Sequence, residues 1–154
     1  MALLFAADRL DHLETEISPN LFDGVNVVCD RYDLSSLAYQ SVTAERPADV
    51  VNTIAWIRQL NQHARRPDLT LVLDVTAEIA AQRRRARGQM AELYEEAEMQ
   101  TQLVQAYRNA TRLLPGDRIV HIDGNGSVDE VARDVSAAVQ ALRRGSMPEV
   151  DQGS

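Results

Sequence analysis

The sequence predicts an α/β fold with a parallel sheet. Three apolar runs of strand length, at about 25–30, 69–74 and 118–123, alternate with stretches in which apolar residues recur at helical spacing. Continuous apolar runs are typical of parallel strands that are buried on both faces. Strands joined by helices then form right-handed crossovers within one sheet. Only these three strands can be counted from the sequence.

The first predicted element is an amphipathic helix from residue 2 to about residue 18. Pro19 and Gly24 then predict a turn into the first strand, at 25–30. Asp30 and Arg31 lie at the end of this strand. The start of a helix that is rich in hydroxyl and amide side chains follows them.

The middle of the chain continues the alternation of helix and strand. A helix is predicted at about 48–64 and a buried strand at 69–74, after Pro67. Thr76 is placed to cap the next helix, which runs from Ala77 into Arg87.

The last part of the chain begins with a predicted hinge at 88–92. A long helix is expected from about 91 to 114, where Pro115 and Gly116 stop it. The last strand, 118–123, is followed by a helix to about residue 144. We expect one domain at 1–144 and a disordered tail at 145–154, with Ser127 and Glu130 forming a capping box at the start of the last helix.

Charge and composition exclude several classes of function. The net charge of −7 and the pI near 4.9 argue against a general nucleic-acid binder, which needs a basic face. No apolar run approaches the length of a membrane span, and no signal peptide is recognisable, so we expect a cytoplasmic protein. Cys29 lies in an apolar run and is expected to be structural.

The histidines give little support for a metal site. His12, His63 and His121 have no second His, Cys or carboxylate at ligand spacing, so no zinc site is predicted. No Ser-His-Asp arrangement can be argued either.

The pair Asp30-Arg31 is the main chemical signal. Ligands of open α/β sheets bind in the crevice at the carboxyl ends of the strands, where this pair is expected to lie. Arg31 could there hold a phosphate bidentately. The alternative is a surface salt bridge from Arg31 to Asp30 or Asp33.

Phe5 and Arg9 are four residues apart and therefore share one face of the first helix. A ring and a guanidinium on one face can hold a planar ligand. The alternative is a core phenylalanine beside a solvated arginine.

Longer motifs resemble the thymidylate kinase family. The stretch 30–32 (Asp-Arg-Tyr) with 35–40 (Ser-Ser-Leu-Ala-Tyr-Gln) is similar to the family's segment after its third strand, and 3–9 is similar to its base-binding helix. The resemblance covers residues 3 to about 143. It continues through 66–75, 85–88 and 118–123.

The resemblance implies dTMP as the acceptor, with ATP and Mg²⁺ as the phosphoryl donor and its metal. It implies a three-layer, P-loop-kinase-like parallel sheet and a homodimer. The residue roles that it implies are as follows: catalytic, Asp30 and Arg31; substrate-binding, Phe5, Arg9, Arg31, Tyr32, Ser36, Tyr39 and Gln40; ATP-side or lid, Arg83 and Arg87. Tyr39 as a core aromatic and the arginines of 83–87 as a solvated helix face are the alternatives.

The donor side of the family pattern is missing from the sequence. There is no Walker A loop, and all 16 basic residues are arginines, so a Walker lysine is excluded. The segment 89–93 also lacks the lid arginine common in the family. We therefore expect a fold truncated at its N-terminus, without the central strand, and a chain that is inactive alone. The alternative is a pseudokinase, a non-catalytic nucleotide-binding or dimerisation module.

Overall fold

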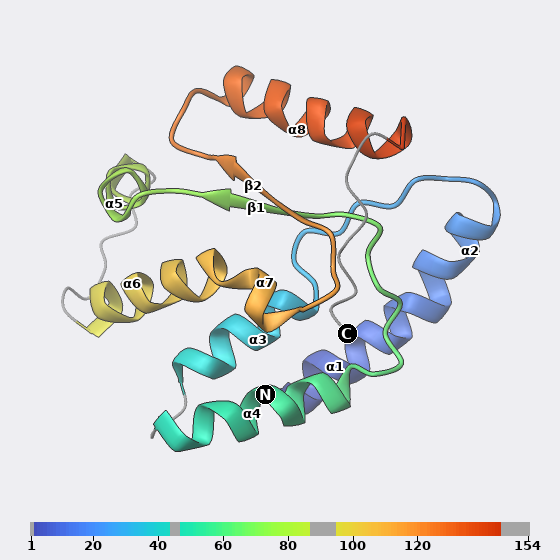
Figure 1. The fold of residues 1–154 in the computed structure, drawn as a ribbon, viewed down its shortest axis with the longest axis horizontal. Helices are drawn as coiled ribbons and strands as arrows, with labels where there is room; N and C mark the ends of the chain where they lie inside the picture. Colours follow the sequence, from blue (N-terminus) through green and yellow to red (C-terminus); the bar gives the residue numbers. More distant parts are fainter. Residues whose placement is uncertain (1, 44–46, 87–94, 146–154) are drawn as a thin grey trace. The chain divides into compact units, whose positions relative to one another are not determined.

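The chain forms two compact units, residues 1–66 and residues 67–154. The computed structural model describes residues 2–43, 47–86 and 95–145, and each unit is described by itself (Figure 1).

The first unit begins with a helical segment longer than the one predicted. Helix α1 (Ala2–His12) continues through a π-helical turn (Leu13–Ile17) into α2 (Ser18–Phe22). The turn predicted at Pro19 is wrong, because Pro19 lies in the first turn of α2, where its missing N–H is tolerated. The wider π-helical step, in which Ser18 N–H donates to Leu13 O, precedes it directly. The segment ends at Gly24, whose φ of 77° suits glycine.

Two further helices complete the first unit, α3 (Asp33–Val42) at the predicted helix start and α4 (Pro47–Leu60), which ends before the predicted residue 64. The two helices pack against each other, and both also contact α1. Leu37 and Ile57 fill the core, each only 1% exposed.

The strand predicted at 25–30 is wrong. Residues 25–29 have no regular secondary structure, and Val28 is 95% exposed. A strand is defined by its ladder to a neighbour, and among the described residues the only ladder joins two strands of the second unit. The described chain therefore has two strands in place of the three that were predicted.

The second unit contains a two-stranded parallel sheet (Figure 1). Strands β1 (Thr70–Asp74) and β2 (Ile119–Asp123) pair in register along their full length, so Asp74 and Asp123 stand side by side at their carboxyl ends. Helix α6 (Glu95–Arg108) contacts β1, and α8 (Val128–Arg143) contacts β2. The parallel sheet with crossover helices is thus confirmed.

The helix predicted at 91–114 is interrupted. Its described part consists of α6 and the short α7 (Ala110–Leu113), with a break at Asn109. The Asn109 amide donates to the carbonyl of Gln105 at 2.9 Å, which is the local competition with helical hydrogen bonds that asparagine offers. Arg87 and the hinge predicted at 88–92 lie outside the described residues.

The remaining helices agree with the sequence. Helix α5 (Ala77–Ala86) begins after Thr76, whose hydroxyl accepts from Ile79 N–H at 3.4 Å. Ser127 and Glu130 form the predicted capping box of α8. No helix in the part of the chain that the structure describes is long and apolar enough to cross a membrane.

Candidate functional site

A buried arginine links the three long helices of the first unit. Arg9 on α1 donates from Nη1 to Asn61 Oδ1, just after α4, and from Nη2 to Ser36 Oγ on α3 at 3.1 Å. Its guanidinium carbon also lies 5.2 Å from the centroid of the Tyr32 ring. These four side chains form the Arg9 cluster.

The charge of Arg9 is desolvated and lies against neutral groups. Arg9 is only 9% exposed, and burial lowers the pKa of its guanidinium, while the charge of Asp33 opposes this shift. Asp33 itself is 3% exposed and accepts a hydrogen bond from Arg66. The nearby carboxylate is therefore engaged by Arg66, and Arg9 donates to an amide and a hydroxyl.

Tyr32 adds an unusual polar group to the cluster. Burial raises the pKa of its phenol, and the negative charge of Asp33 adds to the rise. Its hydroxyl oxygen is buried and has no hydrogen-bond partner within the described residues. A buried polar group without a partner is uncommon in folded proteins, which makes this hydroxyl a candidate for a ligand contact.

Arg31 follows the irregular segment 25–29 in a strained conformation. Its φ of 69° lies in the left-handed region, where a non-glycine residue is uncommon. Its guanidinium carbon is 5.8 Å from the Tyr39 ring centroid, which is a cation–π contact. Strain of this kind is concentrated at functional sites.

The structure brings most of the predicted acceptor-side residues into these two groups. Arg9, Tyr32 and Ser36 form part of one group, and Arg31 with Tyr39 forms the other. The other predicted acceptor residues differ in exposure. Phe5 is 52% exposed on α1, Asp30 is exposed, and Gln40 on α3 is half-buried.

Sequence reasoning missed Asn61, Asp33 and Arg66. A signal for Asn61 was present, because Ile57, Asn61 and Ala64 recur at helical spacing along the buried side of α4 and the turn that follows it, where they are 1%, 7% and 6% exposed. A polar residue on such a face requires a partner.

In the second unit, Arg83 on α5 holds the turn that follows β2. Its Nη1 donates to the carbonyl of Gly124 at 2.8 Å, and its Nη2 donates to the carbonyls of Asn125 and Gly126 at 3.3 and 3.0 Å. The predicted ATP-side arginine thus contacts the carboxyl end of the sheet, where ligands of α/β proteins bind.

The same turn is held by further bonds from both strand ends. Asn125 Oδ1 accepts from Thr76 N–H at 2.9 Å, and Asp123 Oδ1 accepts from Asn125 N–H at 2.9 Å. Gly124 leaves no room for a side chain, because a Cβ atom there would lie 2.8 Å from Val75 Cγ2. The turn is therefore rigidly built.

Metal ligands do not gather in the described parts of the chain. His121 Nδ1 lies 2.8 Å from Asp74 Oδ2, but across 2–43, 47–86 and 95–145 no group of three or more His, Cys, Asp or Glu side chains could hold an ion.

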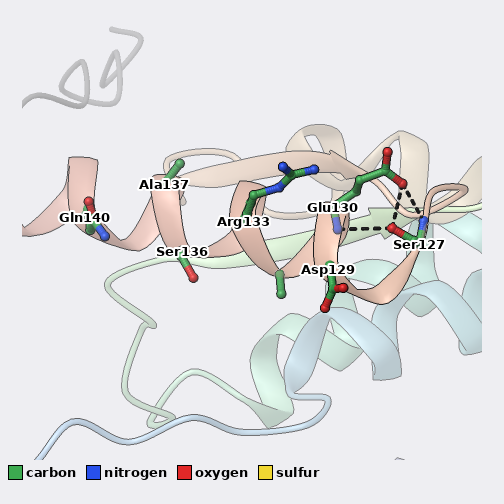
Figure 2. Close-up of a pocket in the computed structure, with 8 residues that line it drawn as sticks. Ser127, Asp129, Glu130, Arg133, Ser136, Ala137 and Gln140 are labelled. Carbon is green, nitrogen blue, oxygen red and sulfur yellow. Dashed lines mark hydrogen bonds between the residues drawn. The ribbon is translucent and has the colours of Figure 1, made fainter.

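An open hollow runs along α8 (Figure 2). Its lining includes the capping box, in which Glu130 Oε2 accepts from Ser127 N–H at 2.8 Å and from Ser127 Oγ–H at 2.7 Å. All the residues that line it belong to α8 or its cap and are exposed, and none is a predicted substrate or ATP residue. We therefore place the candidate site at the two arginine groups of the first unit.

Comparisons with known proteins find relatives along most of the chain. The family model for thymidylate kinase matches residues 1–135. A "Probable thymidylate kinase" of Pyrococcus abyssi is 38% identical over 139 residues, which are 90% of this chain and 63% of that protein. The "Thymidylate kinase" of Rhodopseudomonas palustris is 39% identical over 142 residues, 90% of this chain and 60% of that protein. The chain thus spans less than two thirds of the length of these relatives.

Proposed function

Because the chain belongs to the thymidylate kinase family, we propose that it forms the dTMP-binding part of an enzyme that transfers a phosphoryl group from ATP to dTMP. One observation carries this proposal. The residues predicted for the acceptor gather around two arginines, Arg9 and Arg31, in a single compact unit of an acidic protein.

The phosphate of dTMP is assigned to Arg31. Its guanidinium can form a bidentate pair with a phosphate, and its contact with the Tyr39 ring restricts the orientations that it takes. Asp30, the preceding residue, is exposed, so its carboxylate can approach the phosphoryl group that is transferred. Positioning and charge stabilisation of this kind are the main work of phosphoryl-transfer enzymes.

The thymine base is assigned to the Arg9 cluster. Arg9 donates toward a base carbonyl, the exposed Phe5 ring stacks on the base, and the Tyr32 hydroxyl and Ser36 complete the polar lining. Tyr39 and Gln40 limit the room around the sugar. The carboxylate of Asp33 is engaged by Arg66, and Arg9 itself donates to the Asn61 amide and the Ser36 hydroxyl.

We propose that binding of the phosphoryl donor, ATP, requires residues that this sequence does not contain. Arg83 and Arg87 are assigned to the ATP side, with Arg83 acting through the turn at 124–126. A chain without lysine has no Walker lysine for the β- and γ-phosphates. We propose that these groups, with Mg²⁺, come from residues outside this sequence or from another subunit, and that this chain alone forms no dTDP from ATP and dTMP.

A second candidate is a non-catalytic module that keeps the nucleotide pocket or serves as a homodimer contact. The absence of lysine and of an arginine in 89–93 favours it. Both candidates place the protein in the cytoplasm, and a pyrimidine nucleotide is the ligand of the first candidate and of the second where it keeps the pocket. They differ in catalysis, because addition of a donor part bearing a Walker A loop restores dTDP formation only under the first.

The test is titration calorimetry of the chain with dTMP. We expect Arg31→Ala to raise the Kd by about two orders of magnitude, since a lost charge-assisted hydrogen bond pair is worth about 2–3 kcal/mol. Arg65→Ala is the matched control, because Arg65 is an exposed arginine of the same unit, and its Kd should stay unchanged. Equal affinity of Arg31→Ala and the parent chain would refute the assignment.

A further inference from the structure

Asn61 holds the guanidinium of Arg9 in a defined orientation. Its Nδ2 donates to the carbonyl of Ile57 at 2.7 Å, and its Oδ1 accepts from Arg9 Nη1. A carbonyl only accepts and a guanidinium only donates, so this pair of partners fixes which way round the amide lies. The side chain is 7% exposed, and its backbone N–H also bonds to Ile57 O at 3.2 Å. Asn61 is therefore anchored at one end and presents an acceptor at the other.

The first unit contains two arginines, Arg9 and Arg66, whose acceptors differ in charge. The buried carboxylate of Asp33 goes to Arg66, and the buried amide of Asn61 goes to Arg9. An amide accepts a hydrogen bond from a guanidinium without neutralising it, whereas a carboxylate supplies an opposite charge. Arg9 is thus oriented but keeps its charge available to a further acceptor.

We propose that Asn61 is the positioning residue of the base pocket: it aims Arg9 at a pyrimidine carbonyl and, being neutral, leaves the charge of Arg9 for the ligand. This inference rests on the proposed dTMP site. It adds a residue that acts through Arg9 and does not itself touch the ligand.

The decisive variant is Asn61→Asp, which keeps the size of the side chain and an oxygen toward Arg9. The new carboxylate would pair with Arg9, and a ligand carbonyl would then compete with an ion pair. We expect the Kd for dTMP to rise about tenfold, equivalent to about 1.4 kcal/mol. The Kd for deoxyribose 5-phosphate, which has no base, should not change.

Asn52→Asp is the matched control. Asn52 is an exposed asparagine of α4, so the variant has the same net charge without a contact to the buried cluster. Its Kd for dTMP should equal that of the parent chain. A similar rise in Asn52→Asp and Asn61→Asp would show a general charge effect and would overturn the proposal.

A second measurement tests the positioning without any nucleotide. In ¹⁵N NMR spectra of arginine side chains, the Nη groups of Arg9 should rotate slowly in the parent chain and in Asn61→Asp, and fast in Asn61→Ala. Slow rotation in Asn61→Ala would overturn the positioning role. Absence of dTMP binding by the parent chain would instead overturn the proposed function, while the NMR result would still decide whether Asn61 orients Arg9.

The affinity result has two outcomes. The proposal is supported if Asn61→Asp raises the Kd for dTMP but not for deoxyribose 5-phosphate, and if Asn52→Asp raises neither. Equal affinity of the parent chain and Asn61→Asp, or an equal loss for dTMP and deoxyribose 5-phosphate, overturns it, because a purely structural effect would act on both ligands.

Discussion

The two units use arginine in different ways. In the first unit, Arg9 is buried and donates to side chains from two other segments, Ser36 and Asn61. In the second unit, Arg83 is half-buried and donates to three consecutive main-chain carbonyls of one turn. Both arginines bind neutral oxygens, but only the acceptors of Arg9 are side chains.

This difference distinguishes an arginine that can bind a ligand, Arg9, from one that stabilises the fold, Arg83. The carbonyls at 124–126 have fixed positions in a turn that is also held by Thr76 and Asp123, so Arg83 stabilises the fold at the carboxyl end of the sheet. The Ser36 hydroxyl can rotate, so a ligand oxygen can take its place beside Arg9 while Asn61 stays bonded to the guanidinium. The residues bonded to an arginine are thus more informative about its role than its position in a motif.

The largest expected effect is that of Arg83→Met on stability. The variant leaves three carbonyls without their donor, and we expect the free energy of unfolding to fall by about 2 kcal/mol. Chemical denaturation measures it. Arg85→Met, at an exposed arginine of the same helix, should change the stability by less than about 0.5 kcal/mol. If Arg83→Met also lowered the free energy of unfolding by less than about 0.5 kcal/mol, the distinction between the two units would be lost.

The sequence was informative where local rules decide the structure. The capping box at Ser127 and the cap at Thr76 follow from side chains within a few residues of one another. The parallel strands follow from continuous apolar runs, predicted at 69–74 and 118–123 and found at 70–74 and 119–123. These predictions were confirmed.

The sequence was misleading where a distant partner decides. The apolar run at 25–29 has the composition of a strand, but strand structure also needs a neighbour to pair with, and Val28 is exposed. The bond from Arg9 to Asn61 joins residues 52 positions apart, and no local pattern specifies it. Arg9 and its acceptor Ser36 were predicted from motifs as site residues, but Asn61, the second acceptor of Arg9, was not.

The capping box of α8 provides a smaller test on the scaffold side of the comparison. Ser127→Ala should lower the free energy of unfolding by about 1 kcal/mol, since the cap satisfies N–H groups of the first turn. Ser136→Ala, at an exposed serine within α8, is the control and should have little effect. Equal stabilities of the two variants would show that the cap does not stabilise the helix.

The pH dependence of the same variant follows from Glu130. The hydrogen bonds from Ser127 lower the pKa of the Glu130 carboxyl below its ordinary value of 4.5. A depressed carboxyl pKa stabilises the fold above the ordinary value, and this stabilisation is lost as the pH falls through the lowered pKa. As the pH falls through this range, the free energy of unfolding should therefore decrease less in Ser127→Ala than in the parent chain.

The smallest expected effect is that of Tyr32→Phe. The hydroxyl is buried without a partner among the described residues, so its removal loses no hydrogen bond shown there and relieves a desolvated group. We expect the free energy of unfolding at neutral pH to change by no more than about 0.5 kcal/mol, and any change to be stabilising.

The alkaline behaviour of Tyr32 supplies the sharper measurement. Because burial raises the phenol pKa above its ordinary value of 10.0, the folded state is favoured fully below that value and loses this contribution as the pH rises through the raised pKa. Tyr32→Phe should remove this alkaline loss, whereas Tyr107→Phe, at a half-buried tyrosine of the other unit, should retain it. A destabilisation above about 1 kcal/mol in Tyr32→Phe would mean that the hydroxyl has a partner in the folded protein. The Arg9 cluster would then be scaffold in the same sense as the turn held by Arg83, and the contrast between the two units would be lost.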